Sequence, residues 1–211
     1  MRAAGRTTLV TCGPASVPVD AVRCLTNHST GELGAVLAGE LAAAGFRVLC
    51  FKGSGAVARF GDGYEIKEFQ TNDDLRRLLE EVSRGADVGA VFHAAALSDF
   101  EVCRDELPSL GKLKSDVGGL TLRLRPAEKI LPHLRGWFPD AFVVGWKFEV
   151  DGTVEDARQR ARDQLAACAS DLCVLNGPAA GRGFTVIAPD GTSRDFPDKP
   201  SLAAGLVRRI L

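Results

Sequence analysis

The fold is decided by the stretch Ala141-Phe142-Val143-Val144-Gly145-Trp146, a helical segment over residues 154–168, and the run Leu172-Cys173-Val174-Leu175. The two short runs are apolar and rich in β-branched residues, which is typical of strands at the centre of a sheet. Thr153 stands where the intervening helix is expected to begin. A strand, a helix and a strand in this order predict two parallel strands joined by a right-handed crossover.

The same alternation continues toward the N-terminus. Helices are predicted over residues 33–44 and 73–84 from leucine and valine side chains at helical spacing, with Asn72 as the expected cap of the second. The strands that these helices connect are predicted at three further apolar runs, Thr8-Leu9-Val10-Thr11, Val48-Leu49-Cys50-Phe51 and Val88-Gly89-Ala90-Val91-Phe92.

The C-terminal part has a different pattern. Residues 184–196 predict a β-hairpin around Pro189-Asp190-Gly191, and residues 200–211 predict a last helix. We therefore expect one α/β domain over residues 1–211: a Rossmann-like, three-layer αβα fold with a mostly parallel central sheet and a C-terminal β-hairpin plus helix.

Composition narrows the classes of partner. The 211 residues carry 26 Lys+Arg against 27 Asp+Glu, so the net charge of −1 gives no reason to expect nucleic acid or an anionic membrane as partner. No signal peptide is recognised and no segment approaches about 18 uninterrupted apolar residues, which predicts a cytoplasmic protein. The six cysteines are dispersed without a CxxC pair, which favours buried thiols over zinc ligands or disulfides.

Two polar segments are candidates for phosphate binding. Asn27-His28-Ser29-Thr30-Gly31 precedes the first predicted helix, whose free N–H groups favour anions. Lys112 and Lys114 lie in a long irregular stretch and would supply cations from a second loop. Simpler interpretations stay open: Ser29 or Thr30 as a plain helix cap, and the two lysines as solvated loop charges. Neither GxGxxG nor GxxxxGK[ST] occurs, which argues against an ordinary dinucleotide site or a P-loop.

Residues 20–34 resemble the D-P-V-R-x-[IL]-[ST]-N-x-S-[ST]-G-x-[ML]-G signature of phosphopantothenoylcysteine synthetases. Four further blocks follow in the order that this family has. Residues 94–100 resemble A-A-x-V-[AS]-D-[YF], residues 112–114 resemble K-x-K-K, residues 145–149 resemble G-F-x-x-E-T, and residues 171–176 resemble D-x-[IV]-[VC]-x-N. The blocks span nearly the whole chain.

The resemblance implies a ligase of coenzyme A biosynthesis. In this family the carboxylate of 4′-phosphopantothenate attacks the α-phosphate of CTP or ATP, pyrophosphate leaves, and the cysteine amine displaces the nucleoside monophosphate from the acyl-nucleotidylate. Such chemistry implies Mg²⁺ with the nucleotide. The family also implies a homodimer that can share site residues, and a separate phosphopantothenoylcysteine decarboxylase, because a chain of this length has no room for one.

Residue roles follow from the resemblance. Lys112 matches the family's key lysine and Asn27 the asparagine that binds the acyl group, so both are expected to be catalytic. Asp99 is expected to support the metal or nucleotide. By themselves, Asn27 and Asn176 could stabilise turns, and Asp99 could cap one. The expected nucleotide and phosphate ligands are Gly13, Ser29, Thr30, Gly31, Ala95, Asp99, Phe100, Lys114, Trp146, Lys147 and Asn176.

The chain departs from the family pattern in its first loop and at single positions. Pro14 lacks a backbone donor, and the loop lacks the threonine and glutamate that the family usually has. Glu32 stands where many members have a basic or polar residue, and Ser115 replaces the last lysine of K-x-K-K; Lys147 would compensate. Two alternatives therefore remain: a non-catalytic nucleotide-binding relative, and an NAD(P)-dependent Rossmann-type reductase.

Overall fold

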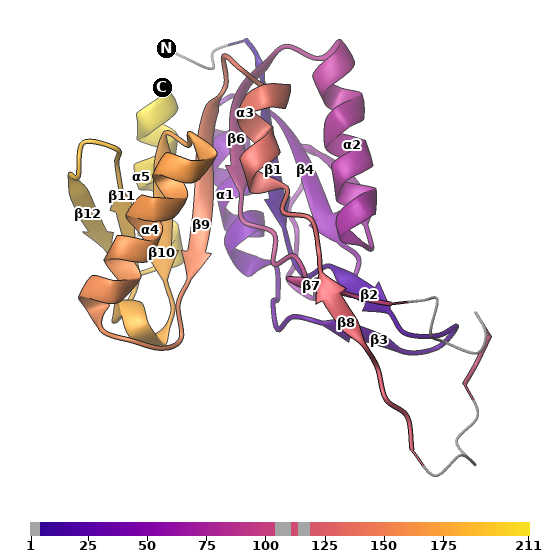
Figure 1. Ribbon diagram of the computed structural model, residues 1–211. Helices are drawn as coiled ribbons and strands as arrows, with labels where there is room; N and C mark the ends of the chain where they lie inside the picture. Colours follow the sequence, from indigo (N-terminus) through magenta and orange to yellow (C-terminus); the bar gives the residue numbers. More distant parts are fainter. Residues whose placement is uncertain (1–4, 104–110, 114–118) are drawn as a thin grey trace.

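The computed structural model describes residues 5–103, 111–113 and 119–211. Within these residues one eight-stranded sheet runs through the molecule in the order β12-β11-β10-β9-β6-β1-β4-β5 (Figure 1). The strands from β5 to β10 in this order are parallel, and β11 and β12 add an antiparallel edge. The bounds are β1 Thr7–Cys12, β4 Arg47–Gly53, β5 Glu65–Phe69, β6 Val88–His93, β9 Phe142–Phe148, β10 Leu172–Asn176, β11 Phe184–Ile187 and β12 Ser193–Phe196.

Helices cover both faces of the sheet (Figure 1). Helices α1 and α5 pack together on one face, and α2, α3 and α4 lie on the other. This arrangement confirms the predicted three-layer α/β fold. The helices are α1 Glu32–Ala43, α2 Asn72–Gly85, α3 Leu134–Trp137, α4 Val154–Cys168 and α5 Lys199–Ile210, with 3-10 turns at Leu131–His133 and Pro178–Ala180.

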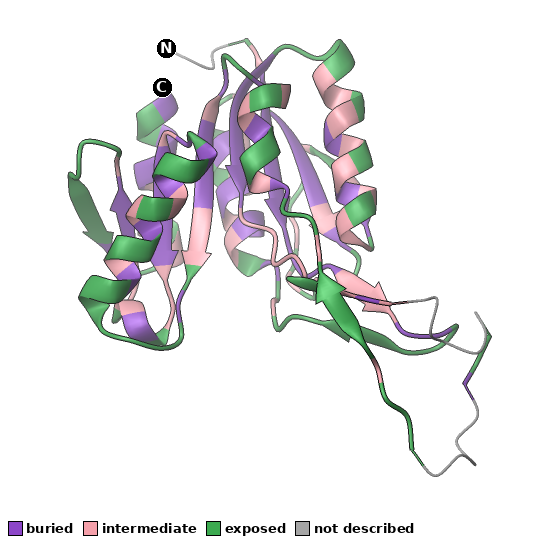
Figure 2. Cartoon of the chain, viewed as in Figure 1, coloured by how far each residue is buried: buried purple, intermediate pink, exposed green. Residues whose placement is uncertain are grey.

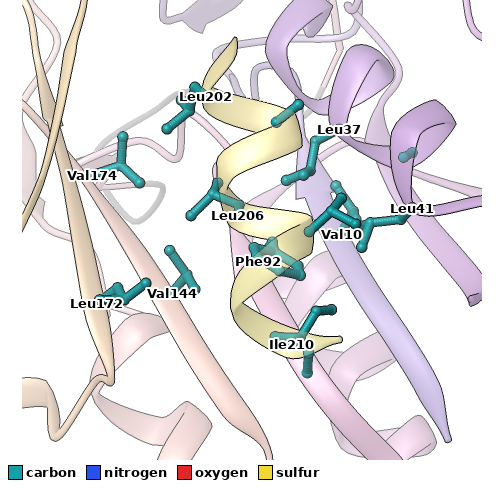
Figure 3. Close-up of a cluster of buried hydrophobic side chains, with 14 of the residues drawn as sticks. Val10, Leu37, Leu41, Phe92, Val144, Leu172, Val174, Leu202, Leu206 and Ile210 are labelled. Atoms are coloured by element: carbon teal, nitrogen blue, oxygen red, sulfur yellow. The ribbon is translucent and has the colours of Figure 1, made fainter. Parts of the chain in front are cut away.

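The alternation of side chains along β1 shows how the layers hold together. Leu9 points into the cluster under α2 and α3, whereas Val10 points into the cluster under α1 and α5. In the second cluster Leu37 of α1 and Leu206 of α5 both pack over the strands (Figure 3). Because both faces are covered, the central strands are apolar on both sides, which is why the sequence shows them as continuous apolar runs.

The predicted elements are found, with one correction and several additions. All five predicted strands, the three predicted interior helices, the C-terminal hairpin and the last helix are present. The cap of α2 is Thr71 rather than Asn72, because Thr71 and Asp74 form a reciprocal capping box. Strand β5 was not predicted; most of its side chains are not buried, so its residues lack the apolar signature of the central strands.

Two short antiparallel pairs project from the carboxyl end of the sheet, and we call them the arms (Figure 1). One arm pairs β2, Ser16–Pro18, with β3, Cys24–Thr26. The other pairs β7, Phe100–Val102, with β8, Leu124–Pro126. The strands of the arms are largely exposed, whereas the central strands of the sheet are buried (Figure 2). The described residues contain no helix long and apolar enough to cross a membrane.

Candidate active site

A cavity of about 750 Å³ lies at the carboxyl ends of β1, β6, β9 and β10. The chain leaves β1 for β4 on one side and later returns to β6 on the other, so the strand order reverses here. Open α/β sheets bind ligands at such switch points. Most of the predicted site residues line this cavity: Gly13, Asn27, Ser29, Thr30, Gly31, Ala95, Asp99, Trp146, Lys147 and Asn176.

The N-terminus of α1 opens onto the cavity. The N-cap residue is Gly31, which has φ 77° and provides no side-chain cap, so the interpretation of Ser29 or Thr30 as the helix cap is wrong. The Thr30 hydroxyl accepts only a long hydrogen bond, 3.3 Å, from the Glu32 N–H. A Cβ at Gly31 would lie 2.8 Å from the Ala56 Cβ. The first turn therefore keeps N–H groups that side chains do not use, as an anion requires.

The unusual first loop starts at the cavity wall, which Gly13 lines, and continues behind it. The Pro14 carbonyl oxygen would lie 2.2 Å from a Cβ at Gly53, so only glycine allows this approach. Pro14 forms an isolated bridge with Ala96, where the Ala96 N–H donates to the Gly13 carbonyl at 2.9 Å and the Ala15 N–H to the Ala96 carbonyl at 3.1 Å. Pro14 thus joins the ends of β1 and β6 without its own N–H.

A buried pair lies at the floor of the cavity, at the ends of β1 and β6, and one member, His93, lines the cavity. The Thr11 Oγ1 and the His93 Nδ1 are 2.8 Å apart, and the Ala95 N–H donates to the same hydroxyl at 3.3 Å. Burial lowers the pKa of His93 to about 4, so the imidazole is neutral at pH 7. Thr11 and His93 therefore hold the backbone at Ala95 without adding charge.

Asn27 is exposed at the end of β3 and bonds across the cavity. Its Nδ2 donates to the Leu97 carbonyl at 2.8 Å, a contact between residues 70 positions apart. Asn27 therefore joins the end of β3 to the segment after β6. The sequence alone also allowed a role in stabilising a local turn. The same segment is tied to α2, because the amide of Asn72 exchanges hydrogen bonds with the backbone of Ser98.

Two ion pairs join elements around the cavity. Lys129 pairs with Asp99, and Lys199 at the start of α5 pairs with Glu32 in the first turn of α1. Both lysines line the cavity and were missed from the sequence, because a single lysine outside a motif resembles any surface charge. Asp99 has its carboxylate paired, and no group of three or more metal-binding side chains occurs among the described residues.

A charge network follows β9. The Lys147 Nζ lies 3.2 Å from one Glu149 oxygen, and the Arg160 Nη1 of α4 lies 2.5 Å from the other. Burial acts to raise the pKa of Glu149, but hydrogen bonds from Arg160 and Lys147 outweigh it and hold the pKa below its ordinary value. Gln164 donates to the Trp146 carbonyl at 3.1 Å. Lys147 is thus held at the cavity wall by a partner that it shares with Arg160.

Two predicted residues, Phe100 and Lys112, do not lie with the others, and a third lies outside the described residues. Phe100 is exposed on β7 and lines a different cavity of about 570 Å³, next to the arms. Lys112 is exposed and is not among the residues that line the larger cavity, because the next residue, Leu113, is bound to the turn after β2. Lys114, like Ser115, lies outside the described residues.

The family model of the DNA/pantothenate metabolism flavoprotein C-terminal domain matches residues 3–210. The chain belongs to this family. Among curated relatives, the coenzyme A biosynthesis bifunctional protein CoaBC of Thermococcus kodakarensis is 30% identical over 211 residues, covering 92% of this chain and 50% of the relative. The human phosphopantothenate–cysteine ligase is 27% identical over 237 residues, covering 86% of this chain and 75% of the relative.

A solved structure of the same family has the same fold. The crystal structure of the DNA/pantothenate metabolism flavoprotein from Streptococcus pneumoniae superposes with a TM-score of 0.83 at 24% identity and covers 98% of each chain. The present member of the DNA/pantothenate metabolism flavoprotein C-terminal family spans about half the length of the bifunctional relative that it matches.

Proposed function

We propose that this chain is a phosphopantothenate–cysteine ligase, which forms an amide bond between 4′-phosphopantothenate and cysteine at the expense of CTP or ATP. The observation that carries the proposal is the gathering of the motif residues from β1, β3, β6, β9 and β10 around one cavity of about 750 Å³. The family and the name of the human relative support the same activity.

The cavity offers a group for each step of this reaction. The N–H groups of the first turn of α1, with Ser29 and Thr30, would bind phosphate oxygens. The amide of Asn27 would orient the acyl oxygen of the acyl-nucleotidylate while the cysteine amine enters. Lys129, Lys147 and Lys199 would balance phosphate charge. Each of these lysines now pairs with a carboxylate, so a triphosphate has to compete with Asp99, Glu149 or Glu32.

Mg²⁺ fits this cavity as an ion that arrives with the nucleotide. Magnesium in phosphate-binding sites takes one or two protein carboxylates together with substrate phosphates and waters. Asp99 would offer one such carboxylate in place of its pairing with Lys129, and the bound ion would neutralise charge on the phosphates. The described side chains do not form a separate metal cage.

The position of Lys112 makes a homodimer part of the proposal. Leu113 is bound to Arg23, and Asn27 follows Arg23 by four residues, just after β3, about 13 Å away in an extended chain. A second copy of the chain that brought its own arms to this cavity would place that copy's Lys112 near a phosphate. The contacts of Leu113 with the turn after β2 would stay intact. The product would pass to a phosphopantothenoylcysteine decarboxylase on another protein or domain.

The test is pyrophosphate release by the purified chain with Mg²⁺, 4′-phosphopantothenate and cysteine, in parallel with CTP and ATP. We expect release with one nucleotide and 4′-phosphopantothenoylcysteine in the mass spectrum. Lys112→Gln and Asn27→Asp should each lower kcat at least about a hundredfold. Lys67→Gln, a control exchange on the edge strand β5, should leave kcat unchanged. Wild-type turnover in both site variants would exclude the assignment.

The altered first loop supports a second candidate, a nucleotide-binding relative without ligase activity. Pro14 removes a backbone N–H donor from this loop. Binding of CTP or ATP in calorimetry without pyrophosphate release would favour this candidate. Binding of NADPH in the same experiment would instead revive a reductase, which the absence of GxGxxG opposes.

A further inference from the structure

Asp20 is an aspartate whose carboxylate is fully enclosed although it belongs to an exposed arm. One oxygen, Oδ1, accepts hydrogen bonds from the N–H groups of Val22 at 2.9 Å and Arg23 at 2.8 Å. These two bonds close the turn between β2 and β3 in the usual manner of an aspartate in a turn. They leave the second oxygen available for another use.

The second oxygen connects the turn to a distant segment. Asp20 Oδ2 accepts a hydrogen bond of 3.0 Å from the N–H of Leu113, 93 positions along the chain. The Arg23 guanidinium donates to the Leu113 carbonyl at 3.0 Å and lies 3.6 Å from the same Asp20 oxygen. Both polar groups of the Leu113 backbone are therefore bound to the turn. A buried carboxylate is costly unless it is paired and hydrogen-bonded, and here it is both.

Apolar packing supports the same contact. The Leu113 side chain is buried in a small cluster with Val19 and Val102. Lys112, one residue earlier, is exposed. The backbone on one side of Lys112 is thus fixed while its ammonium group remains free to meet a ligand.

We propose that Asp20 is a positioning residue that fixes the segment carrying Lys112 to the turn between β2 and β3. Without this carboxylate the segment would rely on a small apolar cluster and one guanidinium, and Lys112 would sample a wide volume. The physical attachment stands by itself, whereas its effect on turnover rests on the proposed ligase function.

The first test is hydrogen exchange at the Leu113 amide in Asp20→Asn. The asparagine keeps an oxygen for Val22 and Arg23 but turns an NH2 group toward the Leu113 N–H, so the change breaks the long-range bond and spares the turn. We expect exchange at Leu113 to become about 10- to 100-fold faster, the effect of losing a hydrogen bond to a charged group. Asp190→Asn is the matched control, because Asp190 bonds only within its own turn, to Thr192.

A second variant, Arg23→Gln, keeps the attachment testable if Asp20→Asn does not fold. Arg23→Gln removes the guanidinium from the Leu113 carbonyl and leaves the Asp20 carboxylate in place, so a smaller acceleration at the same amide is expected. Unchanged exchange at Leu113 in folded Asp20→Asn, or equal acceleration in Asp190→Asn, would overturn the attachment. If Asp20→Asn does not fold, unchanged exchange at Leu113 in Arg23→Gln overturns it instead.

The second test asks whether Asp20 acts through Lys112. Asp20→Asn should lower kcat about tenfold or more with little change in the KM for the nucleotide, and Asp20→Glu should recover part of the loss. In a Lys112→Gln background the same exchange should have no further effect, because coupled residues are not additive. A full additional loss would overturn the positioning role. Absence of turnover in the wild type would remove the ligase proposal and leave the exchange result to decide the attachment.

Discussion

The polar residues of the large cavity and those of the arms are held in place by different kinds of interaction. The cavity is formed by strand ends whose preceding residues are buried on both faces of an eight-stranded sheet. The arms have paired strands of three residues each, and their shared apolar cluster contains three buried side chains. Strands this short bury too little apolar surface to be stable alone. Packing of the core therefore fixes the residues that line the cavity. The residues of the arms depend instead on particular hydrogen bonds, such as those of Asp20.

The largest expected difference between the two regions comes from a pair of phenylalanines. Phe92 on β6 is fully buried, whereas Phe100 on β7 is 51% exposed. Phe92→Ala should lower the free energy of unfolding by about 3–5 kcal/mol, and Phe100→Ala by less than about 0.5 kcal/mol. Urea unfolding of both variants measures this. Similar losses would mean that the arms are as much a part of the cooperative core as the sheet.

A second expected effect is a pH dependence that originates beneath the cavity. Because the pKa of His93 is about 4 in the folded chain and about 6.5 when unfolded, the unfolded state binds more protons between these values. The free energy of unfolding therefore suffers no penalty from His93 above pH 6.5. As the pH drops toward 4, protonation of His93 in the unfolded state lowers it by up to about 3 kcal/mol. His93→Gln should remove this part of the difference between urea midpoints at pH 7.5 and 4.5. An unchanged difference would show that His93 is not the group that titrates.

A third prediction compares two glycines of α1. A Cβ at Gly34, which lines the cavity, would lie 2.1 Å from the Cys12 Cβ, whereas one at Gly39 would have nothing within 4 Å. Gly34→Ala should cost about 1–3 kcal/mol through overpacking. Gly39→Ala should stabilise the helix by up to about 1 kcal/mol. Thermal unfolding of the two variants should therefore shift in opposite directions, and shifts of equal sign would contradict the close approach at Cys12.

The smallest expected effect lies in the arms. Glu101 and Arg125 face each other across β7 and β8, with 2.8 Å between the Glu101 Oε1 and the Arg125 Nε. Both side chains are exposed, so Glu101→Gln should change stability by less than about 0.5 kcal/mol. A clearly larger loss in urea unfolding would mean that paired surface charges, and not only enclosed ones, hold the arms.

How far the sequence predicts this molecule also differs between the regions. Val143, Val144 and their counterparts on the other central strands are apolar because both faces are covered, so these strands and the edge at which Gly13, Ala95 and Asn176 meet could be predicted. The arms could not, because strands of three exposed residues leave no periodic pattern. Lys129 and Lys199 were missed because their positions in the cavity depend on tertiary packing that single lysines do not reveal.

The central place of β1 has a consequence for the order of synthesis. This strand precedes the other strands of the sheet in the sequence, and its parallel neighbours begin only at Arg47 and Val88. The walls contributed by β9 and β10 come later still, the last of them at Asn176. Residues 27–31 are therefore synthesised well before the strands that complete the cavity around them. A ligand that needs the whole cavity can assist folding only after β10 has been made.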